Sequence, residues 1–200
     1  MTNPPSALPQ TLDHFERLYS ASDDPWRVRD SWYEQRKRAL ILAGLPHARF
    51  ANAYEPGCGN GELSAALASR CERLLASDAS DAAVRLARAR LADRTHVTIA
   101  QHVLPAQWPA GERGPFDLIV ISELAYYLEQ ADLDRLIGAT VTSLAGAGTL
   151  ALCHWRHDFD DRQLGTAAIH DAFAARPELA RTVRHAEHDF LLDIWTREAA

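Results

Sequence analysis

A glycine-rich segment followed by a distant acid is the part of the sequence whose residue types and spacing most directly indicate ligand binding. Residues 53–61 read Ala-Tyr-Glu-Pro-Gly-Cys-Gly-Asn-Gly, and Asp78 follows 17 residues after the last glycine. Glycines allow the backbone to turn and to approach a ligand without a Cβ clash. A carboxylate at the end of the next strand can accept hydrogen bonds from both hydroxyls of a ribose. The two features together predict a pocket for a cofactor that carries adenosine.

The spacing of the glycines separates two kinds of nucleotide cofactor. The segment reads Glu-x-Gly-x-Gly-x-Gly and not the Gly-x-Gly-x-x-Gly that packs a pyrophosphate. We therefore expect Gly57 and Gly59 to form the turn and Glu55 to hold an ammonium group, directly or through water. Asn60 either caps the following helix or contacts the cofactor. Cys58 has no base near it in sequence, so we place it beside the cofactor and not as a nucleophile.

An acid and two tyrosines follow the apolar run 116–122. Glu123 stands at the end of this predicted strand, at the edge of the sheet where open α/β folds bind their ligands. It is either a base or substrate-binding carboxylate or a solvated loop acid, and we favour the first interpretation. We expect one of Tyr126 and Tyr127 in the core and the other at a substrate site. Ser122 is expected to border the cofactor.

Ionisable side chains are dense directly after the last of the predicted parallel strands. Residues 154–158 read His-Trp-Arg-His-Asp. This stretch is either a polar loop or a substrate pocket in which His154 or His157 accepts a proton and Arg156 grips an acidic or hydroxylated substrate. The nine histidines are otherwise scattered, and no third and fourth ligand accompanies His154 and His157. We therefore assign no metal site.

Apolar patterns place these residues on repeated strand–helix units. Strands are expected at 50–55, 73–77, 96–100, 116–122 and 149–154, and an antiparallel hairpin at 181–187 and 190–197. Helices are expected at 11–19, from a capping box at Ser31 to Gly44, after the glycine turn, after caps at Ser80 and Asp132, and at 166–176. Gly146 and Gly148 are expected to end the helix that follows Asp132. The alternation predicts an α/β fold with a parallel sheet and right-handed crossovers.

Size and composition bound the class of protein. The chain has 200 residues, of which 47% are hydrophobic, enough for the core of one domain and short for two. The net charge of −6 argues against nucleic acid or an anionic membrane as a partner, since both attract a basic surface. No window approaches 18 uninterrupted apolar residues, and the three cysteines lack metal-type spacing. We expect a cytoplasmic protein with reduced thiols, no signal peptide and no membrane segment.

Several short motifs together resemble the class I S-adenosylmethionine (SAM) methyltransferases, and in particular their nodulation protein S (NodS-like) branch. The motifs are Asp24-Pro25-Trp26, Trp32-Tyr33-Glu34 with Lys37, the segment from Glu55 to Gly61, Leu104-Pro105 with Trp108-Pro109, and Ser122-Glu123 with Tyr126-Tyr127. The resemblance covers about residues 12–155. Their combination is more specific than the glycine turn alone.

This resemblance implies a Rossmann-like, doubly wound sheet of seven strands whose last strand is antiparallel. It implies SAM as methyl donor, S-adenosylhomocysteine as product and a small-molecule acceptor. The nodulation members methylate an amine of a chitin-derived oligosaccharide, so we expect an amine or hydroxyl acceptor, with a sugar derivative among the choices. One domain over residues 1–200 is expected, with an N-terminal helical lid (1–45) and a SAM-binding core (46–200).

The resemblance also extends the set of cofactor residues. Ala79 lies beside the expected ribose-binding aspartate. Trp26 and Tyr33 would close over the cofactor from the lid, unless they only pack the two lid helices together. Many relatives carry an aspartate after the third strand for the adenine amine, whereas Gln101 and His102 stand here. Gln101 offers both a donor and an acceptor to the adenine edge.

Methyl transfer defines roles for the remaining candidates. The displacement requires donor and acceptor in line, a dry site and a free lone pair on the acceptor, so a protonated amine needs a base. The candidates for the base are Glu123, His154 and His157, and those for binding the acceptor are Tyr126, Tyr127 and Arg156. Two other classes stay open: a non-catalytic partner protein with this fold, which the intact acids and glycines disfavour, and a nicotinamide oxidoreductase, which the glycine spacing disfavours.

Overall fold

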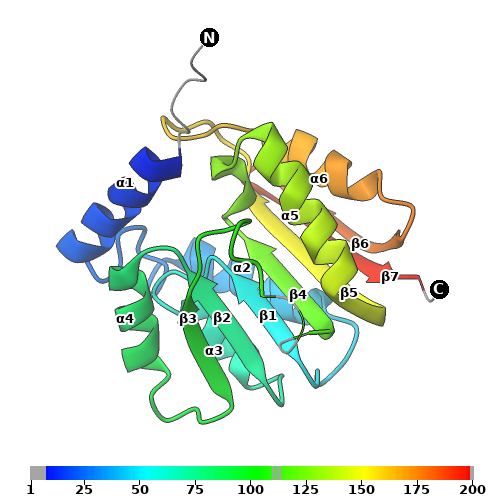
Figure 1. Cartoon of the computed structure of the whole chain (residues 1–200), viewed down its shortest axis with the longest axis horizontal. Coiled ribbons are helices and arrows are strands. Elements are labelled where there is room, and N and C mark those ends of the chain that lie inside the picture. Colours follow the sequence, from blue (N-terminus) through cyan, green and yellow to red (C-terminus); the bar gives the residue numbers. More distant parts are fainter. Residues whose placement is uncertain (1–7, 110, 112–113, 199–200) are drawn as a thin grey trace.

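The computed structural model describes residues 8–109, 111 and 114–198, and it shows a central sheet with helices on both faces (Figure 1). The strands are β1 Ala53–Pro56, β2 Leu74–Asp78, β3 Val97–Gln101, β4 Phe116–Ser122, β5 Leu144–Trp155, β6 Leu179–Ala186 and β7 Phe190–Arg197. The helices are α1 Leu8–Ala21, α2 Trp32–Gly44, α3 Glu62–Ala68, α4 Asp81–Arg90, α5 Gln130–Ser143 and α6 Thr166–Ala174, with the short 3-10 helix η2 at Ala125–Tyr127. The first seven residues of the expected lid lie outside the described residues.

The topology of the sheet confirms the expected Rossmann-like, doubly wound fold. The strand order is β3-β2-β1-β4-β5-β7-β6. Strands β1 to β5 pair in parallel, and β7 runs antiparallel to both of its neighbours, β5 and β6. The chain winds outward from β1 to β3 and returns to β4, so β1 and β4 meet where the winding reverses. Open α/β sheets bind ligands at the carboxyl edge of such a reversal.

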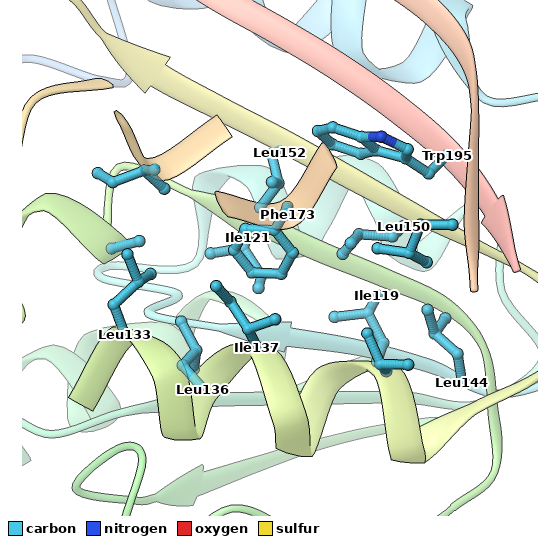
Figure 2. Close-up of a cluster of buried hydrophobic side chains, with 14 of the residues drawn as sticks. Ile119, Ile121, Leu133, Leu136, Ile137, Leu144, Leu150, Leu152, Phe173 and Trp195 are labelled. Carbon is cyan, nitrogen blue, oxygen red and sulfur yellow. The ribbon is translucent and has the colours of Figure 1, made fainter. Parts of the chain in front are cut away.

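Two large clusters of buried hydrophobic side chains hold α2, α3, α5 and α6 on the sheet, and a small third cluster joins Ala87 of α4 to Ala76 of β2. On one face, α5 and α6 pack against the sheet through side chains such as Ile137 and Phe173 (Figure 2). On the other face, α2 and α3 contribute Ile41 and Leu67. Alternate residues of β4 enter the two clusters. Burial on both faces explains why the sequence of β4 is a nearly continuous apolar run. The predicted bounds of this strand, 116–122, are confirmed.

The two N-terminal helices differ in their relation to the sheet. A Cβ on Gly44 of α2 would lie 2.7 Å from Cδ1 of Ile194 in β7, so α2 packs directly on the sheet. Of the two expected lid helices, α1 alone stands apart from it (Figure 1). The expected capping box of α2 does not form. Ser31 makes no side-chain cap bond, and Glu34 is instead bonded to Lys37.

Strand β5 begins directly after α5, earlier than expected, and the two glycines expected to end the helix lie inside the strand. A Cβ on Gly148 would lie 2.9 Å from the carbonyl oxygen of Ala145 and 3.1 Å from that of Phe116. Glycine here allows close approach of backbone to backbone. Helix α5 also begins earlier than expected, after Glu129, and Asp132 is a buried residue of its first turn and not its cap.

Two local expectations are confirmed. Strands β6 and β7 form the antiparallel hairpin. Ser80 caps α4, since its Oγ accepts a hydrogen bond from the Ala83 N–H at 3.1 Å. Within the described part of the chain, none of the helices combines the length and the apolar character needed to cross a bilayer.

Candidate active site

A cavity of about 700 Å³ lies between α1, α2 and the carboxyl ends of β1, β2 and β4. The predicted residues that line it are Trp26, Tyr33, Glu55, Gly57, Cys58, Gly59, Asn60, Asp78, Ala79, His102, Ser122, Glu123, Tyr126 and Tyr127. Helix α1 adds Phe15 and Tyr19, and α2 adds Lys37. Residues from distant parts of the sequence therefore meet at the reversal point of the sheet.

The glycine turn adopts backbone conformations that other residues disfavour. The φ angles are +74° at Gly57, +53° at Gly59 and +82° at Gly61, all in the left-handed region. A Cβ on Gly59 would stand 2.3 Å from Oη of Tyr19 in α1. The turn thus presents bare backbone to the cavity and allows α1 to approach it closely.

Asp78 is fixed by backbone donors on both sides of its carboxylate. Oδ2 accepts a hydrogen bond from the Gly59 N–H at 2.9 Å, and Oδ1 accepts one from the Ser80 N–H at 3.0 Å. Burial raises the pKa of Asp78, and these two N–H groups partly counteract that rise. Each carboxylate oxygen retains a further lone pair. The aspartate can therefore still accept the two hydroxyls of a ribose.

Glu55 carries an unsatisfied polar atom at the end of β1. The residue is 2% exposed, and its Oε2 has no hydrogen-bond partner. Burial raises the pKa of Glu55 to about 8. A buried carboxylate without a partner is costly, and a bound cation would remove that cost. The residues present therefore fit a ligand that carries an ammonium group.

Glu123 is held by three donors at the end of β4. Its Oε1 lies 2.6 Å from Lys37 Nζ, and its Oε2 accepts hydrogen bonds from Tyr126 Oη at 2.6 Å and from the Trp155 N–H at 2.9 Å. The φ of Glu123 is +55°, unusual for a residue other than glycine. The carboxylate is thus part of the cavity wall and not a solvated loop acid.

Lys37 stands between two carboxylates. Its ammonium also lies 2.8 Å from Oε1 of Glu34, in addition to the contact with Glu123. Burial alone would lower the pKa of Lys37, but the two carboxylates outweigh burial and raise it. Burial raises the pKa of Glu34, which also lines the cavity. The cluster therefore holds one buried cation against two acids.

His154, expected as a base, does not reach the cavity. Its side chain is fully buried and its two ring nitrogens are engaged, Nε2 by the Ala125 N–H at 3.2 Å and Nδ1 by Nε2 of His170 at 3.1 Å. His170 Nδ1 in turn lies 2.9 Å from Oδ2 of the buried Asp193. Burial lowers the pKa of His154 well below the ordinary value. This histidine belongs to a buried polar chain under the η2 turn.

Three other expected site residues also point elsewhere. His157 Nε2 lies 2.9 Å from Oδ1 of Asp189, and the Arg156 guanidinium donates to the carbonyl of Glu187. Both follow β5 and are bonded to the turn between β6 and β7, outside the cavity lining. Gln101 donates to the Ala79 carbonyl at 3.0 Å and also lies outside the lining, so His102 is the member of this pair at the cavity.

Aromatic side chains tie α1 to the cavity. Phe15 packs edge-on against Tyr127 at 4.7 Å between ring centroids. At the same end of the cavity, His14 Nε2 lies 3.1 Å from Oδ2 of Asp161, in the loop between β5 and α6. Phe159 of that loop lies 5.6 Å from Tyr127. These contacts close the cavity between α1 and the loop.

Sequence reasoning missed several of these residues as members of the site. Lys37 belongs to a motif that carries the family resemblance, and Glu34 to the expected capping box, but neither role predicts a cavity wall. The available signal for Lys37 was that it is the single lysine of the chain. No pattern in the sequence pointed to Phe15 or Asp161.

The comparisons with known proteins converge on one group. A family model described as Nodulation protein S (NodS) matches residues 11–174. Nodulation protein S of Rhizobium tropici is 33% identical over 145 residues, which cover 70% of this chain and 60% of that protein. The chain thus spans about 60% of the length of the curated relatives it matches.

Solved structures agree with that match. A structure from Pseudomonas syringae of a protein assigned as a methyltransferase is 51% identical, with a TM-score of 0.73, and the match covers 84% of this chain and 100% of that one. The crystal structure of N-methyltransferase NodS from Bradyrhizobium japonicum WM9 in complex with S-adenosyl-L-homocysteine is 26% identical, with a TM-score of 0.82 and coverage of 94% and 98%.

Proposed function

The chain belongs to the nodulation protein S (NodS) family, and we propose that it is a SAM-dependent methyltransferase that methylates an amine of a small-molecule acceptor. The observation that carries the choice of cofactor is the unpartnered, buried Oε2 of Glu55 beside the glycine turn. The ammonium of the SAM amino-acid tail would satisfy this oxygen. A pyrophosphate would instead bring negative charge towards it, which disfavours a nicotinamide cofactor.

The cavity offers a place for each part of SAM. Asp78 would accept the ribose hydroxyls, Glu55 would hold the ammonium and the glycine turn would border the amino-acid tail. His102 would border the adenine, since it lines the cavity, whereas Gln101 lies outside the lining and its amide is bonded to a backbone carbonyl. When bound, SAM supplies a methyl carbon already activated by its sulfonium, so the leaving thioether needs no acid.

The charge of the cavity favours a cationic acceptor. The carboxylates contributed by α2, by the turn after β4 and by the loop after β5 are those of Glu34, Glu123, Asp160 and Asp161. The basic side chains of the lining are those of Lys37, Arg38 and His14, and His14 is paired with Asp161. These four acids therefore still outnumber the two permanent cations, Lys37 and Arg38. An amine is protonated at neutral pH, and an acidic wall attracts it more strongly than a neutral alcohol. We therefore place an amine ahead of a hydroxyl, with no assignment of the carbon skeleton that bears it.

Glu123 and Glu34 are suited to different tasks. A carboxylate has about four lone-pair sites, and Glu123 uses three of them for Lys37, Tyr126 and the Trp155 N–H. The remaining site can accept an acceptor N–H and orient its nitrogen. Because these three bonds fix the carboxylate in place, Glu123 is assigned to orienting the acceptor. Glu34, whose pKa burial raises, is better matched to removing the amine proton.

Calorimetric titration with SAM, S-adenosylhomocysteine and NAD tests the cofactor, and release of S-adenosylhomocysteine from a panel of amines and matched alcohols tests the reaction. We expect both sulfur nucleosides to bind and NAD not to bind. Turnover is expected with one or more amines and not with the matched alcohols. Binding of NAD would overturn the cofactor assignment, and absence of binding by every nucleotide would indicate a non-catalytic partner protein.

A further inference from the structure

A cluster of metal-ligating side chains lies outside the cavity, where the turn between β6 and β7 meets the segment after β5. His188 and Asp189 occupy the turn, and His157 follows β5. His157 Nε2 lies 2.9 Å and His188 Nδ1 2.8 Å from the same atom, Oδ1 of Asp189. Among the described residues, these three form a group whose ligand atoms all lie within 4.8 Å of one another. Two imidazoles and a carboxylate are a donor set that suits Zn²⁺ and related divalent ions.

We propose that His157, His188 and Asp189 bind a divalent transition-metal ion, with Zn²⁺ as the best match. Three protein ligands with one position left for water is the composition of an open zinc site. Tetrahedral bonds of about 2.1 Å place the ligand atoms roughly 3.4 Å apart, so Asp189 needs to withdraw by about half an ångström. The three side chains are 39%, 85% and 43% exposed, so this adjustment meets little resistance.

The proton balance of binding is simple. In the metal-free protein, the two imidazole N–H groups face one carboxylate oxygen. In the metal-bound protein, the same nitrogens present lone pairs, and each neutral ring carries its proton on its other nitrogen. Metal binding by two neutral rings therefore moves a proton within each ring and releases none.

Neighbouring groups define the coordination shell. The Glu187 carboxylate is engaged by Arg36 at 2.7 Å and by His185 at 2.5 Å, so it is not offered as a fourth ligand. The Arg156 guanidinium is turned to the Glu187 carbonyl. A water molecule would then be the fourth ligand of the ion.

The position of the cluster gives the ion a structural consequence. The rings of His157 and Trp155 lie 4.7 Å apart, and Trp155 lines the cavity and donates its N–H to Glu123. A metal bound by His157 and the hairpin turn would tie β5 to the tip of the hairpin at this point. We therefore expect the ion to stabilise the fold next to the cavity while leaving the cavity itself open.

The test uses the full chain without a histidine tag, treated with EDTA and titrated calorimetrically with ZnCl₂. We expect one Zn²⁺ per chain and a rise in Tm on the order of 5–10 °C at a hundred-fold excess over Kd. The variants H188N and D189N should bind at least 10-fold more weakly, since loss of even an outer partner of a metal ligand costs 10–100-fold. The control H47N removes an exposed imidazole elsewhere and should bind as the wild type does.

Three results would overturn the proposal: the same affinity in all four proteins, loss of binding in H47N alone, or no heat of binding at 100-fold molar excess. The Tm of each metal-free variant, which should stay within a few degrees of the wild type, shows that the chain is folded. Should a variant not fold, the visible spectrum of the Co²⁺-loaded wild type decides. Strong absorption supports nitrogen and oxygen ligation by the protein, whereas the spectrum of aqueous Co²⁺ contradicts it.

Discussion

The ammonium of Lys37 lies 2.6 Å from Oε1 of Glu123, although 86 residues separate the two in sequence. Lys37 comes from α2 and Glu123 from the turn that ends β4, so this ion pair joins the helix to the wall of the cavity. The backbone of Glu123 is in the left-handed region, a conformation that costs on the order of 1–3 kcal/mol at a residue other than glycine. The bonds from Lys37, Tyr126 and the Trp155 N–H offset this cost.

Replacing Lys37 by Met should destabilise the protein, because the carboxylates of Glu34 and Glu123 would share one site without a cation. Removing one partner of a buried ion pair costs about 3–5 kcal/mol, and water reaches the 26% exposed Glu123 side chain, so we expect about 2–3 kcal/mol. Urea unfolding measures the loss. In the control R85M, the exposed pair with Asp81 is removed, which should change stability by less than about 0.5 kcal/mol. Similar losses in both variants would contradict the buried pair.

The proposed division of labour between two acids is open to kinetics. Glu34→Gln removes the proton acceptor and should lower kcat by about 100-fold. Glu123→Gln removes an orienting carboxylate and should raise the KM for the amine by about 10-fold with a smaller change in kcat. Both variants should bind S-adenosylhomocysteine as the wild type does. If a variant changed only the affinity for the cofactor, its residue would belong to the cofactor site and not to the acceptor site.

The raised pKa of Glu55 makes the stability of the ligand-free protein depend on pH. Burial raises the pKa from 4.5 to about 8, so between these values the folded protein holds a proton that the unfolded chain has lost. Stability should therefore fall as the pH rises through this window, by up to a few kcal/mol, and level off above pH 8. Urea unfolding at pH 5.5 and pH 8.5 measures the difference. Glu55→Gln should flatten it, and an unchanged slope would exclude Glu55 as the source.

Local sequence was sufficient to predict the features that depend on neighbouring residues. The glycine turn follows β1 and Asp78 ends β2, and these two strands are adjacent and parallel. A strand–helix–strand pattern in the sequence is therefore enough to predict that they lie together. The bounds of β4 follow from its burial on both faces. By contrast, the pairing of Lys37 with Glu123 depends on how α2 packs on the sheet. No local sequence pattern predicts that packing.

The prediction that His154 reaches the cavity was wrong for a different reason. Strand β5 is buried on both faces, so its sequence does not reveal which of its residues face the cavity and which face α6. His154 faces α6, where His170 is its partner, and His170 is in turn bonded to Asp193 of β7. His170 lies beside the apolar residues Ile169 and Phe173 of α6, and this pattern does not define the direction of its side chain. The ionisable residues of the segment 154–158 are therefore divided between two places. His154 belongs to a buried polar chain, and His157 contacts the turn between β6 and β7.

Gly59 provides a test of the contact between the glycine turn and α1. Alanine at this position would adopt a left-handed φ, at a cost of about 1–2 kcal/mol, and its Cβ would stand 2.3 Å from Oη of Tyr19. We expect G59A to lose this stability in urea unfolding and to bind S-adenosylhomocysteine at least 10-fold more weakly, because α1 must shift. In the double variant with Y19F the nearest ring atom is 3.4 Å away, so affinity should partly recover while the loss of stability from φ persists.

As a control, G138A in α5 meets nothing within 4 Å and should stabilise the helix by about 0.5–1 kcal/mol. Full recovery of stability in the double variant would show that the clash, and not the backbone conformation, requires glycine at this position.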